Sequence, residues 1–232
     1  MTGGYLKASC GCRALFALLL LAAVAAAQSY KVQTQGTPPP EELAPAIRES
    51  LAHETIRVVG PEGLLCEIWL RKTVPARAVG KQELGVAYGQ LAEGTLVGVV
   101  RFIPIATDYR RQRIKPGVYT LRYALQPVDG NHMGVSPYRD FLLLAPAAAD
   151  LSPAPVIQAE LLNLSRQASG TGHPSVWSLT AAEGNHSTLP ALAHKEEEDH
   201  WILYFRVVLQ PENASPSGLV MALVVVGHAP EA

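Results

Sequence analysis

Apolar and polar residues alternate over much of the chain, and this pattern predicts short β-strands. In residues 118–126 the apolar Leu121 and Tyr123 point one way, and the polar Thr120 and Arg122 point the other. Such alternation is typical of an antiparallel strand with one buried face and one solvent-exposed face. The same pattern, bounded by Gly and Pro turns, predicts further strands at residues 55–59, 64–71, 95–102, 138–144, 174–179, 201–209 and 219–227.

The period changes before the first of these strands. In residues 41–52, Leu43, Ile47 and Leu51 are spaced at i, i+4 and i+8, which is one face of a short amphipathic helix. Three consecutive prolines precede this helix, so we expect residues 28–40 to form a flexible, Pro-rich tail. One short N-terminal helix and many short strands predict a mainly β protein, an antiparallel β-sandwich.

Domain organisation follows from the same pattern. We expect residues 41–232 to form a single β-sandwich domain, because the later strands are needed to complete a second sheet. Residues 145–155 contain three prolines and could act as a hinge, which leaves two smaller β domains as the alternative.

The N-terminal residues 1–27 match a cleavable secretory signal peptide. Lys7 and Arg13 supply positive charge, every residue from 14 to 27 is apolar, and the run ends in three alanines. The run is shorter than the roughly 20 residues of a membrane-spanning helix. We therefore expect an exported protein, periplasmic or extracellular, with no membrane span after cleavage.

Cleavage also changes the composition. Loss of Lys7 and Arg13 lowers the Lys and Arg count from 19 to 17 against 20 acidic residues, so the net charge moves from −1 to −3. Without a basic surplus, nucleic acid is not an expected partner. Cys66 is the single cysteine of the mature chain, and its strand context predicts a small buried apolar residue rather than a disulfide or a reactive thiol.

Residues 129–140 form the connection with the most chemistry. It joins two predicted strands, is longer than the usual 2–5 residues of a hairpin loop, and concentrates polar side chains. A plain turn is the alternative, since Asp-Gly and Asn are turn formers. The candidate ligand-binding residues are Asp129, Asn131, His132, Tyr138, Arg139 and Asp140.

Neither a metal site nor catalysis is favoured by the motifs. Asp129 and His132 are suitable metal ligands, but no further His or Cys follows at ligand spacing, so metal binding is left unknown. No G-x-S-x-G, HExxH or CxxC pattern occurs, and we assign no catalytic residue and no cofactor. Whether the protein is an enzyme is undecided by sequence, with a non-catalytic role favoured.

Three segments carry a resemblance to a family. Residues 94–100 (GTLVGVV), 114–121 (IKPGVYTL) and 129–134 (DGNHMG) resemble a group of uncharacterised exported bacterial β-sandwich proteins. The resemblance covers mainly residues 94–144. It implies a β-sandwich fold and an extracytoplasmic location, and it carries no activity.

Together these observations predict an exported, non-catalytic binding module. We expect the loop at residues 129–140 to bind a protein partner, a glycan or a small ligand. A structural component of an envelope assembly is the first alternative. The second is a metal-binding or hydrolytic domain that uses Asp129, His132 and Asp140.

Overall fold

The computed structural model describes residues 1, 3, 29–129, 132 and 134–230. The expected signal peptide therefore lies outside the described residues, apart from two isolated positions. The helices are α1 (Pro45–Ser50) and α2 (Gln158–Ser169). The strands are β1 (Lys31–Gly36), β2 (Leu51–Gly60), β3 (Gly63–Arg71), β4 (Val74–Ala76), β5 (Leu96–Phe102), β6 (Ala106–Thr107), β7 (Arg113–Ile114), β8 (Gly117–Leu125), β9 (Asp140–Pro146), β10 (Val176–Thr180), β11 (Ala191–Lys195), β12 (His200–Pro211) and β13 (Ser217–Val226).

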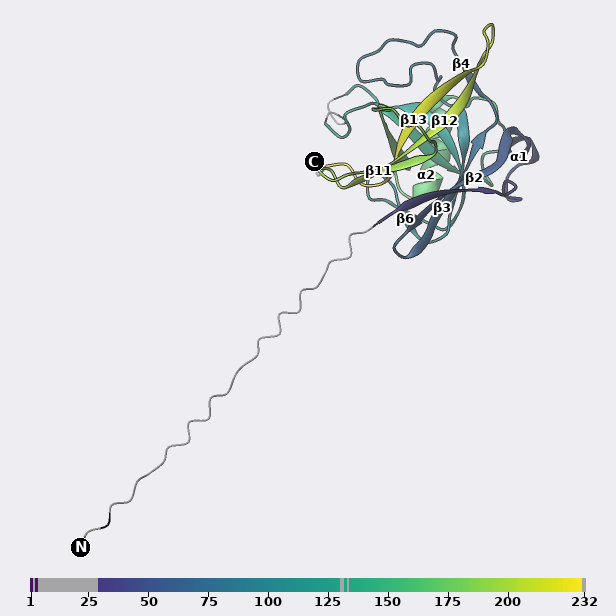
Figure 1. Cartoon of the computed structure of the whole chain (residues 1–232). Helices are drawn as coiled ribbons and strands as arrows, with labels where there is room; N and C mark the ends of the chain where they lie inside the picture. The colour runs from purple at the N-terminus through teal and green to yellow at the C-terminus, as the bar shows by residue number, and fades with distance from the viewer. Residues whose placement is uncertain (2, 4–28, 130–131, 133, 231–232) are drawn as a thin grey trace.

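Eleven strands form one large mixed sheet that curls on itself (Figure 1). The strand order is β1-β2-β3-β5-β8-β9-β10-β13-β12-β11, and β4 adds a parallel pairing to β12. The ring of Tyr30, just before β1, lies 5.2 Å from that of Trp201 on β12, so the curl brings distant strands together. The mainly β prediction is confirmed. A division into two stacked antiparallel sheets is not evident, because β10 pairs with both β9 and β13 and joins the halves.

The expected tail at residues 28–40 contains strand β1 instead of flexible chain. Its backbone pairs with β2 over the whole length, from Lys31 opposite Val59 to Gly36 opposite Glu54. Most β1 side chains are exposed, so the strand shows no apolar alternation in sequence. Pro39 is buried beyond it, where the chain turns toward α1.

Helix α1 is shorter than predicted but buries the predicted face. The helix spans only Pro45–Ser50, because Pro45 lies at its start and β2 begins directly after it. Leu43, Ile47 and Leu51 are all buried in one cluster. The spacing of apolar residues therefore identified the packing face correctly, although part of that face lies outside the helix.

Helix α2 and several short or exposed strands, β4, β6, β7 and β11, lie outside the predicted elements. Helix α2 packs against β9, and it buries Leu161, Leu164, Ser165 and Ala168. The polar Ser165 interrupts the apolar stripe, so the helical period was not recognised. Strand β11 lies within residues 183–199, for which the sequence pattern predicts no strand; its side chains are exposed or only half-buried.

The face of β8 that was expected to contact solvent is buried. Thr120 and Arg122 are both 0% exposed, because residues 145–157 fold over them. Asp150 in this segment accepts hydrogen bonds from Arg122 Nε at 2.6 Å and Nη2 at 2.7 Å. Thr120 Oγ1 donates to the same carboxylate at 2.5 Å. The prediction that this face of β8 contacts solvent is wrong, because the alternation of residues within a strand does not show which other segment covers the strand.

Candidate ligand-binding site

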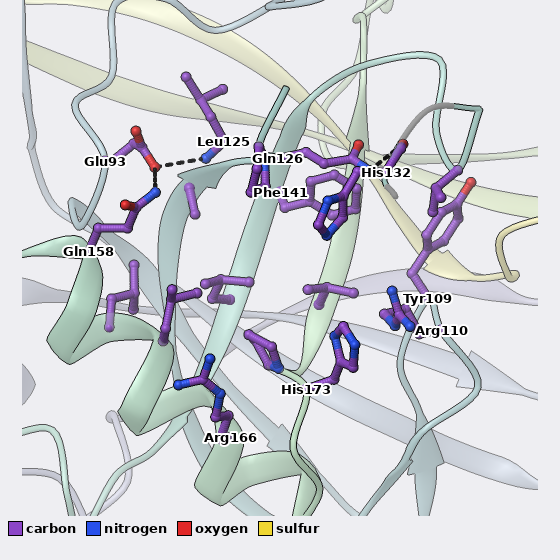
Figure 2. Close-up of a pocket in the computed structure, with 18 of the residues that line it drawn as sticks. Glu93, Tyr109, Arg110, Leu125, Gln126, His132, Phe141, Gln158, Arg166 and His173 are labelled. Atoms are coloured by element: carbon purple, nitrogen blue, oxygen red, sulfur yellow. Dashed lines mark hydrogen bonds between the residues drawn. The ribbon is translucent and has the colours of Figure 1, made fainter. Parts of the chain in front are cut away.

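A cavity of about 360 Å³ lies between α2 and the outer face of strands β8, β9 and β10 (Figure 2). Ala124 of β8 pairs with Phe141 of β9, and Leu143 of β9 pairs with Val176 of β10. Residues directly opposite in antiparallel strands share a face, so these four side chains form an apolar floor. Leu161 of α2 belongs to the same cluster as Ala124 and lines the cavity from the side of the helix.

The small side chain of Ala124 helps to explain why space remains. Protein interiors are normally close-packed, with few voids larger than a water molecule. Here α2 packs on β9 through Leu161, and the short side chain of Ala124 lines the cavity that remains beside this contact. The volume falls in the low part of the range of small-molecule sites.

Basic side chains from three separate segments line the cavity. They are Arg110, which precedes β7; His132, from the loop before β9; Arg166 of α2; and His173, which follows α2. Figure 2 shows Glu93 and Gln158 at the opposite end from Arg110, His132 and His173. The site is therefore polar at two ends and apolar between them.

These basic groups influence one another. Partial burial lowers the pKa of His173, and the charges of Arg110, His132 and Arg166 lower it further, against an opposing contribution from Asp108. Arg166 is held in place because its Nε donates to the carbonyl of Gly172 at 3.0 Å. Arg110, His132 and Arg166 thus lie close enough to His173 for their charges to lower its pKa.

The predicted loop contributes part of the site. His132 Nδ1 lies 2.6 Å from Asp129 Oδ1, and Gln126 Nε2 donates to the His132 carbonyl at 2.8 Å. The structure thus brings Asp129 and His132 together, with His132 lining the cavity. Asn131 lies outside the described residues.

The other predicted residues lie elsewhere. Asp140 is fully buried, and its carboxylate accepts hydrogen bonds from Ala87 N at 2.8 Å, Tyr88 N at 3.0 Å and Tyr123 Oη at 2.6 Å. These bonds tie residues 87–88 to the sheet. Asp140 therefore does not converge with Asp129 and His132, as the metal-binding or hydrolytic alternative required.

Arg139 and Tyr138 are also outside the cavity lining. Arg139 Nη1 pairs with Glu83, and its Nε donates to the carbonyl of Gln126 at 3.0 Å. Hydrogen bonds from Arg139 and Lys81 lower the pKa of Glu83 to about 2. Tyr138 is half-buried. Arg139 therefore holds the loop to residues 81–85.

Sequence reasoning missed Arg166 and His173 because it missed α2, which positions both. Arg110 lies in a segment with three arginines that could be noticed in sequence, but nothing there indicated a cavity. Its position is set by the preceding Asp108, which is buried and accepts hydrogen bonds from the backbone N–H groups of Arg110 and Gln112. The signal that was available is the i, i+3, i+7 spacing of Leu161, Leu164 and Ala168.

Metal and thiol chemistry find no support at this site. Across the described residues, no three His, Cys, Asp or Glu side chains gather closely enough to hold a metal ion. Cys66 is buried as predicted, and burial raises the pKa of its thiol.

Neither α1 nor α2 has the length and apolar content needed to cross a membrane.

Comparisons with protein families, with curated proteins and with solved structures find no match to this chain. The function is therefore inferred from the residues of the site.

Proposed function

We propose that this protein is an exported, non-catalytic binding protein that holds a small, largely apolar molecule between α2 and the sheet. The ligand contacts the floor of Ala124, Phe141 and Leu143 and is covered by Leu161. The loop residue His132, which contacts Asp129, forms part of the cavity lining.

The observation that carries the proposal is the apolar-floored cavity on the outer face of β8, β9 and β10, because the inner face of these strands is filled with side chains. The inner face of the same strands packs tightly: Tyr123, Leu142 and Trp177 are at most 2% exposed. Burial of apolar ligand surface in the outer cavity supplies about 25 cal/mol per Å². A ligand would also restore the van der Waals contacts that the cavity walls lack.

Filling the cavity from within tests this proposal. The substitution Ala124→Leu adds three carbon atoms to the floor, and we expect it to reduce binding of a neutral apolar dye, such as Nile red, at least tenfold. The matched control is Ala159→Leu, which places the same side chain at an exposed position of α2 outside the cavity. Dye fluorescence gives the affinity, and circular dichroism checks the fold.

A second variant covers the case in which Ala124→Leu does not fold. Leu162 lines the cavity and is half-buried, so Leu162→Trp blocks the space from the entrance. Wild-type protein that binds no apolar dye, or binding that survives in a folded blocking variant, would overturn the proposal.

A further inference from the structure

We infer that the ligand is an anionic amphiphile, with its alkyl or aryl part in the apolar cavity and a carboxylate-like head beside Arg110 and His173. This inference rests on the proposed function and adds the chemical class of the molecule.

The arrangement of charge favours a negative head at one defined end. Arg110, His132 and His173 lie opposite Glu93 and Gln158 (Figure 2). Glu93 is the single acid that lines the cavity among the described residues. An anionic head is therefore attracted to the first end and repelled from the second, which fixes the direction of the chain.

Arg110 has unused binding capacity. Elsewhere Arg101, Arg122 and Arg139 each pair with a carboxylate of the protein. The Arg110 side chain is exposed, and no hydrogen bond or ion pair joins its guanidinium to the described residues, whereas its backbone N–H donates to Asp108. A guanidinium presents donors in a planar fork that matches a carboxylate, so an external carboxylate fits this position.

The histidines add capacity that depends on the ligand. The ring of His173 makes no hydrogen bond with the described residues, while His132 is oriented through its contact with Asp129. An anion placed between Arg110 and His173 favours protonation of His173, because an opposite charge nearby stabilises the charged imidazole. Asp108 is near but directs its carboxylate to Gln112 and to the backbone of β10.

The size of the cavity limits the apolar part. With a volume of about 360 Å³, the cavity is near the lower limit of small-molecule sites. A chain of about eight carbons suits this space, whereas a long-chain lipid would extend into solvent.

The test compares three eight-carbon probes, octanoate, octan-1-ol and octylammonium, with acetate, which has the charged head without the chain. We expect octanoate to bind about tenfold more tightly than octan-1-ol at low salt, and octylammonium and acetate to bind most weakly. Titration calorimetry measures the affinities, and the preference for octanoate should shrink as salt screens the exposed charges.

Two variants test whether the anionic head of the ligand binds beside Arg110. Arg110→Gln should weaken octanoate about five- to tenfold and leave octan-1-ol unchanged. Arg113→Gln removes an exposed arginine of β7 that does not line this cavity, and it should change neither affinity. A control effect as large as that of Arg110→Gln would indicate a general charge effect and would contradict the inference.

The outcomes separate the two proposals. Equal binding of octanoate and octan-1-ol, both lost in Ala124→Leu, would overturn the anionic class and leave the binding function intact. Tighter binding of octylammonium would do the same. Failure of every eight-carbon probe and of the neutral dye would overturn the binding function itself.

Discussion

Arg122 and Ala124 lie two residues apart on the same outer face of β8, yet their surroundings differ completely. Around Arg122 the polar groups are saturated: the guanidinium contacts the Asp150 carboxylate and the carbonyls of Gly94, Ser152 and Ala154. Around Ala124 the walls are apolar and a cavity remains, with the exposed side chains of Arg110 and His173 among its lining. The Arg122 side chain has a complete set of partners within the fold, whereas an open cavity with an apolar floor and a few polar groups is typical of a binding site.

The largest expected effect comes from removing the carboxylate that pairs with Arg122. Asp150→Ala leaves Arg122 buried and unpaired, and loss of one partner of a buried ion pair typically costs about 3–5 kcal/mol of unfolding free energy. Urea unfolding measures this cost. The double variant Arg122→Met with Asp150→Ala should recover much of the loss, because no buried charge remains. A single variant within about 1 kcal/mol of wild type would show that the pair is not structural.

The second largest expected effect is a difference in unfolding free energy between substitutions on the inner and outer faces of β9. Leu142 points into the filled core and Leu143 points toward the cavity, and both are nearly fully buried. We expect Leu142→Ala to cost about 3–5 kcal/mol and Leu143→Ala about 2 kcal/mol, since the outer site already borders open space. Only Leu143→Ala should also change dye affinity. Equal costs with unchanged affinity would contradict the distinction between the two faces.

The smallest effect is a pH dependence at the cavity entrance. Because the pKa of His173 is lowered in the folded state, the unfolded chain binds the proton first. Stability therefore falls as the pH drops through and below the ordinary range of histidine. The difference between wild type and His173→Gln, measured by thermal unfolding from about pH 8 to about pH 5, isolates this group from His228 and Asp108.

Octanoate should reduce this acid-dependent loss, because an anion near His173 raises its pKa. A pH profile identical in wild type and His173→Gln would remove this residue from the site. An acid-dependent loss that octanoate leaves unchanged would place the anionic head elsewhere.

The strands of the sheet were largely predictable because their inner faces are apolar and alternate. In β12, Leu203, Phe205 and Val207 are buried while Arg206 and Val208 are exposed, as the alternation indicates. Strands β1 and β11 were missed for the opposite reason, since most of their side chains contact solvent and only the backbone pairs. Of the six predicted site residues only His132 lines the cavity, whereas Arg166 and His173 depend on a helix that the sequence pattern did not indicate.

Sequence by itself determined that the chain is mainly β, that Leu43, Ile47 and Leu51 share one buried face, and that Cys66 is buried. These are local properties, set by the period of apolar residues and by strand context. Tertiary structure alone decided that the outer face of β8 is covered, closed at Arg122 and open at Ala124. The covering segments follow β8 by some 20 to 50 residues, and a strand's own pattern carries no information about which segment packs over it.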